Sequence, residues 1–227
     1  MPHEHLTGHT NPWRQAQHAI DWIASNDQEP PERDEELGAL ISLLPFTPTA
    51  PIRILELGAG HGVLTRLLLD RFARAQVIAL DLSPVMVSEG QRRLSDAGDR
   101  VRFIEWDLER PGWPEQAPGP FDAVVSSLAV HHLPRRQKAL LAREVYAHLK
   151  PGGVLLHLDY VAPPSETLAE RYLRTVADGE HRPHLAGGHA TDTLLEQMDD
   201  LREAGLVDVD VFWKRYSLAL FGGTRPV

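Results

Sequence analysis

The chain of 227 residues contains no cysteine. A disulfide framework, a thiolate metal site and an iron–sulfur cluster are therefore excluded. The same absence rules out a catalytic cysteine nucleophile and any radical chemistry that depends on a cysteine-bound cluster. The chemistry of this protein must rest on oxygen and nitrogen side chains.

The chain also has fewer basic than acidic residues, and it has no long apolar run. The formal net charge is -9, and the lysines are Lys138, Lys150 and Lys214 alone. An acidic balance leaves no electrostatic footprint for a nucleic-acid backbone, so we expect no nucleic-acid partner. No apolar run reaches the length of a membrane span, and the polar N-terminus is not typical of a signal peptide. We therefore expect no membrane partner and a cytoplasmic location.

One stretch organises the rest of the chain, Ile52 to Gly62, which reads IRILELGAGHG. An apolar run ends in glycines at alternate positions, Gly58, Gly60 and Gly62, and an amphipathic run follows. This order of strand, tight loop and helix opens many nucleotide-binding α/β sheets. A dinucleotide loop would place the third glycine one residue later, and Glu56 would repel a pyrophosphate. That acid suits a ligand carrying an ammonium and a sulfonium.

The pattern E-x-G-x-G-x-G resembles the first motif of class I S-adenosylmethionine-dependent methyltransferases. The segment ALDLSPVM is similar to the second motif, and it places Asp81 where an acid can accept both ribose hydroxyls. The segments FDAVVSSLAVHHLP and LKPGG, and the C-terminal stretch, are also similar to the family. The resemblance covers about Ile52 to Gly223, and it implies S-adenosylmethionine as cofactor and S-adenosylhomocysteine as product.

Carrying the motifs over residue by residue gives a set of cofactor-binding positions. They are Glu56, Gly58, Ala59, Gly60, Asp81, Leu82, Met86, Asp107, Leu108 and Ser126. In the family these positions imply that Glu56 and the glycine loop hold the methionine end of the cofactor. Asp81 holds the ribose, and Asp107 with Leu108 holds the adenine.

Acid–base and acceptor residues are less sharply defined by the sequence. His131 and His132 are the catalytic candidates, because they follow the fourth expected strand beside the methyl donor; either one could instead hold the start of a helix. The candidates for the substrate pocket, each of which could equally be a packing residue, are Trp22, Tyr160, His189 and Trp213. No metal is expected, because the spacing of the acidic and histidine residues in 180–189 fits no standard site.

The expected fold class is α/β, a Rossmann-like doubly wound sheet of seven strands with an antiparallel C-terminal hairpin and helices on both faces. We expect a single methyltransferase domain over 1–227. Its parts are an N-terminal helical cap (1–50), a cofactor-binding core (51–159), an insertion that shapes the substrate pocket (160–190) and a C-terminal helix with a β-hairpin (191–227). We expect Thr191 to cap that helix, and the fifth strand to begin at Val154 after the LKPGG turn.

The resemblance implies transfer of a methyl group to a small-molecule acceptor by in-line displacement. Two alternatives stay open: an enzyme of the same fold that remodels S-adenosylmethionine itself, and a non-catalytic module that only binds it. The sequence specifies neither the acceptor atom nor the oligomeric state, for which a homodimer is one option.

Overall fold

The computed structural model describes residues 11–25, 31–175 and 192–227. Within these ranges seven strands form one sheet in the order β3-β2-β1-β4-β5-β7-β6. They are β1 (Arg53–Leu57), β2 (Gln76–Asp81), β3 (Val101–Glu105), β4 (Phe121–Ser127), β5 (Leu149–Tyr160), β6 (Val207–Arg215) and β7 (Leu218–Thr224). The first five strands are parallel, and β7 runs antiparallel to both β5 and β6. The predicted seven-stranded sheet with an antiparallel hairpin is confirmed.

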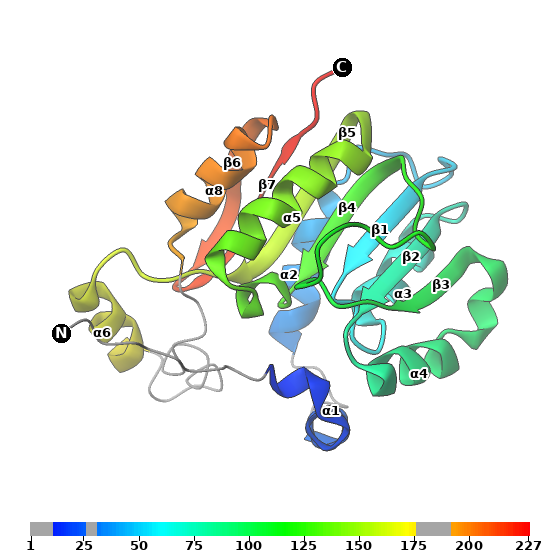
Figure 1. The fold of residues 1–227 in the computed structure, drawn as a ribbon, viewed down its shortest axis with the longest axis horizontal. Coiled ribbons are helices and arrows are strands. Elements are labelled where there is room, and N and C mark those ends of the chain that lie inside the picture. Colours follow the sequence, from blue (N-terminus) through cyan, green and yellow to red (C-terminus); the bar gives the residue numbers. More distant parts are fainter. Residues whose placement is uncertain (1–10, 26–30, 176–191) are drawn as a thin grey trace.

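Helices cover both faces of this sheet (Figure 1). Those described are α1 (Ala16–Ser25), α2 (Pro31–Ser42), α3 (Val63–Arg71), α4 (Pro84–Arg93), α5 (Arg135–His148), α6 (Glu166–Thr175) and α8 (Leu194–Glu203), with short 3-10 turns η1 (Pro12–Arg14), η2 (Ser95–Arg100) and η3 (Val130–His132). Apolar residues of α2, α3 and α4 pack on one face, and those of α5 and α8 on the other. Each described helix falls short of the length and apolar character needed to cross a membrane.

The core follows from two sequence patterns. Central strands such as β4 are apolar almost throughout, which suits a parallel strand covered on both faces. On the helices the apolar residues recur at helical spacing, as with Leu37, Leu40 and Ile41 of α2, which are all buried. Each fully buried leucine contributes on the order of 1.5–3 kcal/mol. The two apolar layers hold the loops at the carboxyl ends of the strands in fixed positions.

The fifth strand differs from the expectation. It begins at Leu149, and the predicted LKPGG turn lies inside it as an irregularity: Phe121 pairs with Leu149, whereas Ala123 pairs with Val154. Gly153 has no room for a side chain there, since a Cβ would lie 2.9 Å from the Lys150 carbonyl oxygen. The glycines therefore permit a bulge in a continuing strand.

The last helix starts later than expected. Its N-cap is Thr193 and not Thr191, which lies outside the described residues. The Thr193 hydroxyl accepts the Glu196 backbone N–H, and the Glu196 carboxylate accepts the Thr193 N–H at 2.8 Å, which together make a capping box. Gly205, at φ 104°, follows the end of the helix as predicted.

Candidate functional site

The glycine loop after β1 has the backbone that its sequence predicts. Gly58, Gly60 and Gly62 have φ angles of 66°, 55° and 92°, in the left-handed region that favours glycine. The Ala59 N–H donates to the Leu80 carbonyl at 2.9 Å, which ties the loop to the end of β2. The loop leads into α3, and its Gly58 and Gly60 are half-buried.

Glu56 lies at the carboxyl end of β1 and is buried. The pKa of its carboxyl is raised from 4.5 to about 8, chiefly by burial and also by the charge of Asp81, while a hydrogen bond from the Thr65 hydroxyl and the charge of Arg33 act the other way. The acid is therefore largely neutral at pH 7 in the free protein. An ammonium group placed beside it would favour its ionised form.

Asp81 lies at the carboxyl end of β2, on the neighbouring strand. One carboxylate oxygen accepts the Gly60 N–H at 2.7 Å, and the other accepts the Ser83 N–H at 2.8 Å. Burial raises the pKa of Asp81, and these two backbone bonds oppose the shift. Each oxygen keeps a second lone pair, so the carboxylate can still accept two hydroxyls. The predicted neighbours lie alongside: Leu82 is half-buried and Met86 is buried in the first turn of α4.

Asp107 follows β3 and is also buried. One of its oxygens accepts the Glu109 N–H at 2.9 Å, and the other accepts the Arg14 guanidinium at 2.7 Å. Leu108 is half-buried, and its carbonyl accepts the Gln137 amide at 2.9 Å. The described residues therefore bring three acids to adjacent strand ends, in the order of the strands β1, β2 and β3. Ser126 at the end of β4 is different, because its buried hydroxyl donates to the Leu57 carbonyl at 3.0 Å and so joins β4 to β1.

The two candidate histidines have different surroundings. His131 is 2% exposed, and its Nδ1 lies 2.5 Å from the carboxylate of Asp159, which also accepts the His131 backbone N–H. Burial acts to raise the pKa of Asp159, but the charge and hydrogen bond of His131 hold it below its usual value. This geometry favours a structural role for His131 at the start of η3. His132 is half-buried, and its Nε2 accepts the indole N–H of Trp13 at 3.1 Å.

Two of the four predicted pocket residues lie at the same edge of the sheet. Tyr160 is buried with its ring edge-on to His131 at 5.4 Å, and burial raises the pKa of its phenol to about 12. Trp22 packs its ring 5.5 Å from that of His61 in the glycine loop. Trp213, on β6, packs against the apolar core. His189 lies outside the described residues, as do the other acidic and histidine residues of 180–189.

Sequence reasoning missed three residues of the site: Trp13, Arg14 and Arg33. Trp13 and Arg14 reach His132 and Asp107 across 119 and 93 positions of sequence. Arg33 acts on the charges of Glu56 and Tyr160 from the first turn of α2. No motif marks these three residues as part of a site. For Trp13 and Arg14 the sequence shows only that an aromatic and a basic residue follow Pro12.

Comparisons with known proteins agree with this geometry. A family model described as a methyltransferase domain matches residues 54–153. The chain is 31% identical over 196 residues to a trans-aconitate 2-methyltransferase of Deinococcus radiodurans, covering 81% of this chain and 68% of that protein. It is 36% identical over 115 residues to a demethylmenaquinone methyltransferase of Thermus thermophilus, covering 51% of this chain and about half (50%) of that relative.

Among solved structures, human N-acetylserotonin methyltransferase in complex with SAM has the same fold. Its TM-score is 0.66 at 15% identity, and the match covers 100% of this chain and 61% of that one. The chemistry of the donor set fits the cofactor of this family: a buried acid could pair with an ammonium, a carboxylate with two lone pairs left could accept two ribose hydroxyls, and a third acid follows the next strand. The chain belongs to the class I S-adenosylmethionine-dependent methyltransferase family.

Proposed function

We propose that this protein transfers a methyl group from S-adenosylmethionine to a small-molecule acceptor. The observation that carries the proposal is the row of acids Glu56, Asp81 and Asp107 on adjacent strand ends around the glycine loop. Their order corresponds to the ammonium, ribose and adenine of the cofactor. When bound, the cofactor supplies an activated methyl, whose bond to sulfur breaks as carbon bonds to the acceptor's nucleophilic atom, leaving neutral S-adenosylhomocysteine.

The task of the protein is then alignment and exclusion of water. Glu56 and Asp81 would fix the two ends of the sulfonium-bearing chain, and near-attack geometry can supply several kcal/mol of the barrier. Aromatic rings at this edge, those of Trp13, Trp22 and Tyr160, would favour a cation and keep water away. His132 is the half-buried histidine at this edge, and it is the better candidate for taking a proton where the acceptor has one to lose.

Two observations support a small molecule as the acceptor. The net charge of -9 disfavours a nucleic-acid substrate. The two relatives from Thermus thermophilus and Deinococcus radiodurans are named for demethylmenaquinone and trans-aconitate, both of which are small molecules. Because these two acceptors are chemically unlike each other, the class of acceptor atom is left to experiment.

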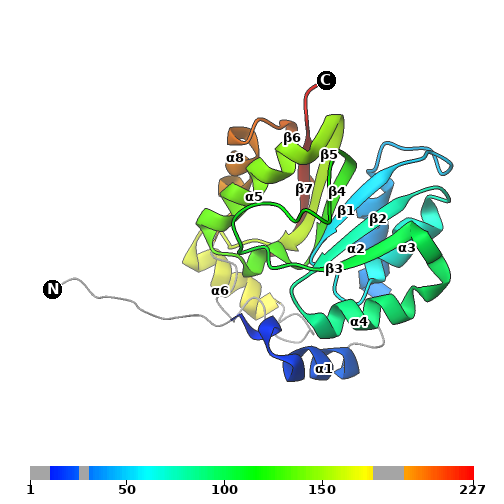
Figure 2. The same cartoon turned by 45° about the vertical axis from the view of Figure 1, so that its right-hand side comes forward.

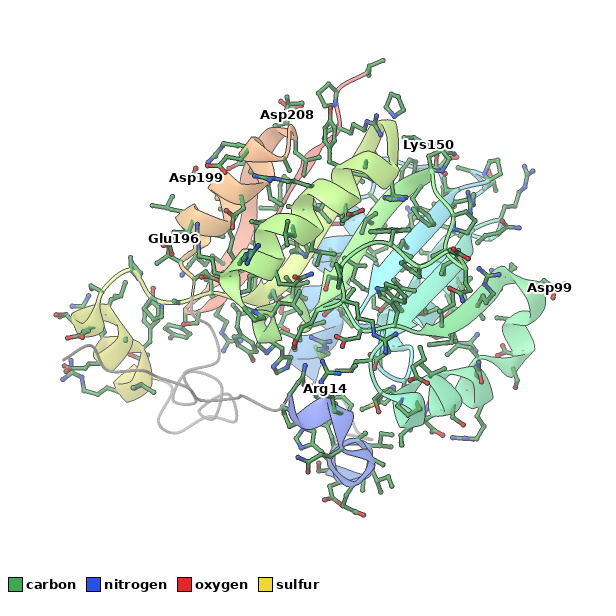
Figure 3. The ribbon with its side chains drawn as sticks, in the orientation of Figure 1. Arg14, Asp99, Lys150, Glu196, Asp199 and Asp208 are labelled. Atoms are coloured by element: carbon green, nitrogen blue, oxygen red, sulfur yellow. The ribbon has the colours of Figure 1, made fainter. Side chains whose placement is uncertain are left out.

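Calorimetric titration with S-adenosylmethionine and S-adenosylhomocysteine tests the cofactor site. We expect micromolar binding by the wild type and at least tenfold weaker binding by Asp81→Ala, a loss of about 1.4 kcal/mol or more. Asp99→Ala is the matched control, because Asp99 lies far from the glycine loop at the exposed end of η2 (Figure 3), and it should bind like the wild type. A folded, cofactor-free wild type that binds neither compound would overturn the proposal.

The same protein, incubated with a panel of small acceptors, tests the reaction. Release of S-adenosylhomocysteine with at least one acceptor is expected. Binding without turnover on any acceptor would favour the non-catalytic module, and a modified cofactor retained by the purified protein would favour the remodelling enzyme.

A further inference from the structure

Four polar side chains come together between α5, α8 and β5, on the face of the sheet opposite α2, α3 and α4. The helices α5 and α8 lie side by side on this face (Figure 2). A cavity of about 20 Å³ between them is lined by Lys138 of α5, His157 of β5, and Gln197 and Asp200 of α8, and its remaining walls are apolar. None of these four residues belongs to the row of acids to which the cofactor is assigned. What the cavity binds is therefore independent of the proposed function.

His157 places a buried ring nitrogen at this cavity. The residue is 6% exposed, and its Nδ1 has no hydrogen-bond partner among the described residues. The pKa of the imidazole is lowered from 6.5 to about 4, chiefly by burial; the charge of Asp159 opposes this shift, and the charge of Lys138 adds to it. The ring is therefore neutral at pH 7. In either neutral tautomer Nδ1 is a donor or an acceptor, so this buried atom requires a partner.

Asp200 supplies a second polar atom of this kind. One of its carboxylate oxygens lies 3.4 Å from the Arg135 guanidinium, whereas Oδ2 is buried and has no partner in the described part of the chain. Lys138, which is 5% exposed, donates to Asp192 at 2.5 Å. An ammonium has three N–H groups, so Lys138 retains donors for a further acceptor. The residues around the cavity thus supply one donor group and two atoms that lack a partner.

Size and charge restrict what the cavity can hold. Its volume of about 20 Å³ exceeds the roughly 10–15 Å³ that one water molecule needs, and it is far too small for an organic ligand. The ammonium of Lys138 disfavours a cation, and the carboxylates of Asp192 and Asp200 disfavour an anion. A small neutral molecule with both donors and acceptors remains, and water is the molecule that meets these conditions.

We propose that this cavity is the binding site of one structural water molecule. The water accepts an N–H of Lys138 and donates to His157 Nδ1 and to Asp200 Oδ2. Because Nδ1 then accepts, the proton of the neutral His157 ring is on Nε2. Three hydrogen bonds are the usual number for a buried water, and these three join α5, β5 and α8.

The water site lies beside the contact that joins the segment after β5 to the segment before α8. The Asp192 carbonyl accepts the Ala162 N–H at 2.8 Å, and the Asp192 carboxylate accepts the Lys138 ammonium. Because the water accepts a second N–H of Lys138, it restrains the same ammonium that holds Asp192. The water therefore stabilises this contact as well as the packing of the two helices.

A crystal structure of the full chain, at a resolution that shows ordered water, tests the site. We expect density for one water molecule at hydrogen-bond distance, about 2.7–3.2 Å, from Lys138 Nζ, His157 Nδ1 and Asp200 Oδ2. A cavity without density would overturn the proposal, and so would a cavity that contains an ion.

Two variants of His157 provide a matched pair for thermal unfolding. In His157→Gln the amide oxygen can still accept from the water, whereas the leucine of His157→Leu is of similar size and accepts nothing. We expect Tm to fall by roughly 3–8 °C in His157→Leu, because the water and its other partners lose a hydrogen bond. The fall in His157→Gln should be less than half as large.

The other results of this comparison would contradict the water site. A Tm of His157→Leu at or above that of the wild type would overturn the proposal, because an apolar side chain stabilises where it replaces a buried polar group that has no partner. Equal losses in the two variants would overturn it too, since they would reflect altered packing alone. If neither variant folds, the wild-type crystal structure decides.

Discussion

At the scale of single residues, the buried carboxyl of Glu56 lowers the stability of the folded protein when it ionises. Its pKa of about 8 in the folded protein lies above the ordinary value of 4.5. The folded state therefore binds more protons than the unfolded state between these values, and the free energy of unfolding falls as pH rises from about 4.5 to about 8. Buried acids with raised pKa values cluster at functional sites.

We expect cofactor binding to release a proton from Glu56. The ammonium of S-adenosylmethionine favours the carboxylate, so a group that is mostly protonated in the free protein at pH 7 ionises in the complex. Calorimetry in two buffers of different ionisation heat measures the release, which should approach one proton per site near pH 7 and vanish near pH 9. Glu56→Gln, which is nearly isosteric, should release none and bind at least tenfold more weakly. Binding heats of the wild type that do not depend on the buffer would contradict this assignment.

The sequence predicted the acids of the site because each one belongs to a local motif. Glu56 precedes the glycines, and Asp81 and Asp107 follow apolar strands. Arg14 and Trp13 could not be found in that way, since their partners are 93 and 119 residues away and nothing local requires them. Long-range contacts of this kind depend on how residues 11–25 dock on the sheet, which is a tertiary property.

At the scale of elements, the loop after β1 packs closely against the segment after β4. A Cβ on Gly58 would lie 2.1 Å from the Cβ of Ala129, far inside van der Waals contact. Gly58 also has a φ of 66°, which is strained for any other residue. The close approach of these two elements therefore leaves no room for a side chain at position 58.

We expect Gly58→Ala to destabilise the protein by roughly 2 kcal/mol or more and to impair cofactor binding, because strain and overlap add. Gly38→Ala is the matched control: Gly38 is exposed within α2, a methyl group there would have nothing within 4 Å, and alanine should stabilise by about 0.5–1 kcal/mol. Urea unfolding followed by circular dichroism measures both. Equal free energies of unfolding for the two variants would contradict this prediction, because they would show that the glycine loop can move to accommodate a side chain at position 58.

Element boundaries were the part of the fold that the sequence predicted least well. Thr191 and Thr193 are both good capping residues, but only Thr193 has a glutamate three positions later, so the capping box was a usable signal. The long β5 had no such signal, because a Lys-Pro-Gly-Gly run is typical of a turn. The strand nevertheless continues past that run, because its pairs with β4 resume at Val154 and its pairs with β7 begin there.

At the scale of the whole molecule, the strands of the core and those of the C-terminal hairpin share one sheet. β7 lies between β5 and β6, so the C-terminal hairpin is hydrogen-bonded to the core that precedes it. A buried ion pair, Lys138 to Asp192 at 2.5 Å, also joins α5 to the segment before α8. The seven-stranded sheet with its C-terminal hairpin was predicted from the resemblance to the family, whereas this ion pair across 54 residues has no local signature. Shared apolar layers predict that core and hairpin unfold together.

We therefore expect a single thermal unfolding transition, with the same midpoint by circular dichroism and by calorimetry. S-adenosylhomocysteine at 100 times its dissociation constant should add about 2.7 kcal/mol. For a chain of this size that shifts Tm by roughly 5–10 °C, at about 2–4 °C per kcal/mol. Asp81→Ala should keep the single transition and lose most of the shift at the same ligand concentration. Two separate transitions would mean that the hairpin or the N-terminal part unfolds as an independent unit. A shift confined to one of the two transitions would locate the cofactor site in that unit.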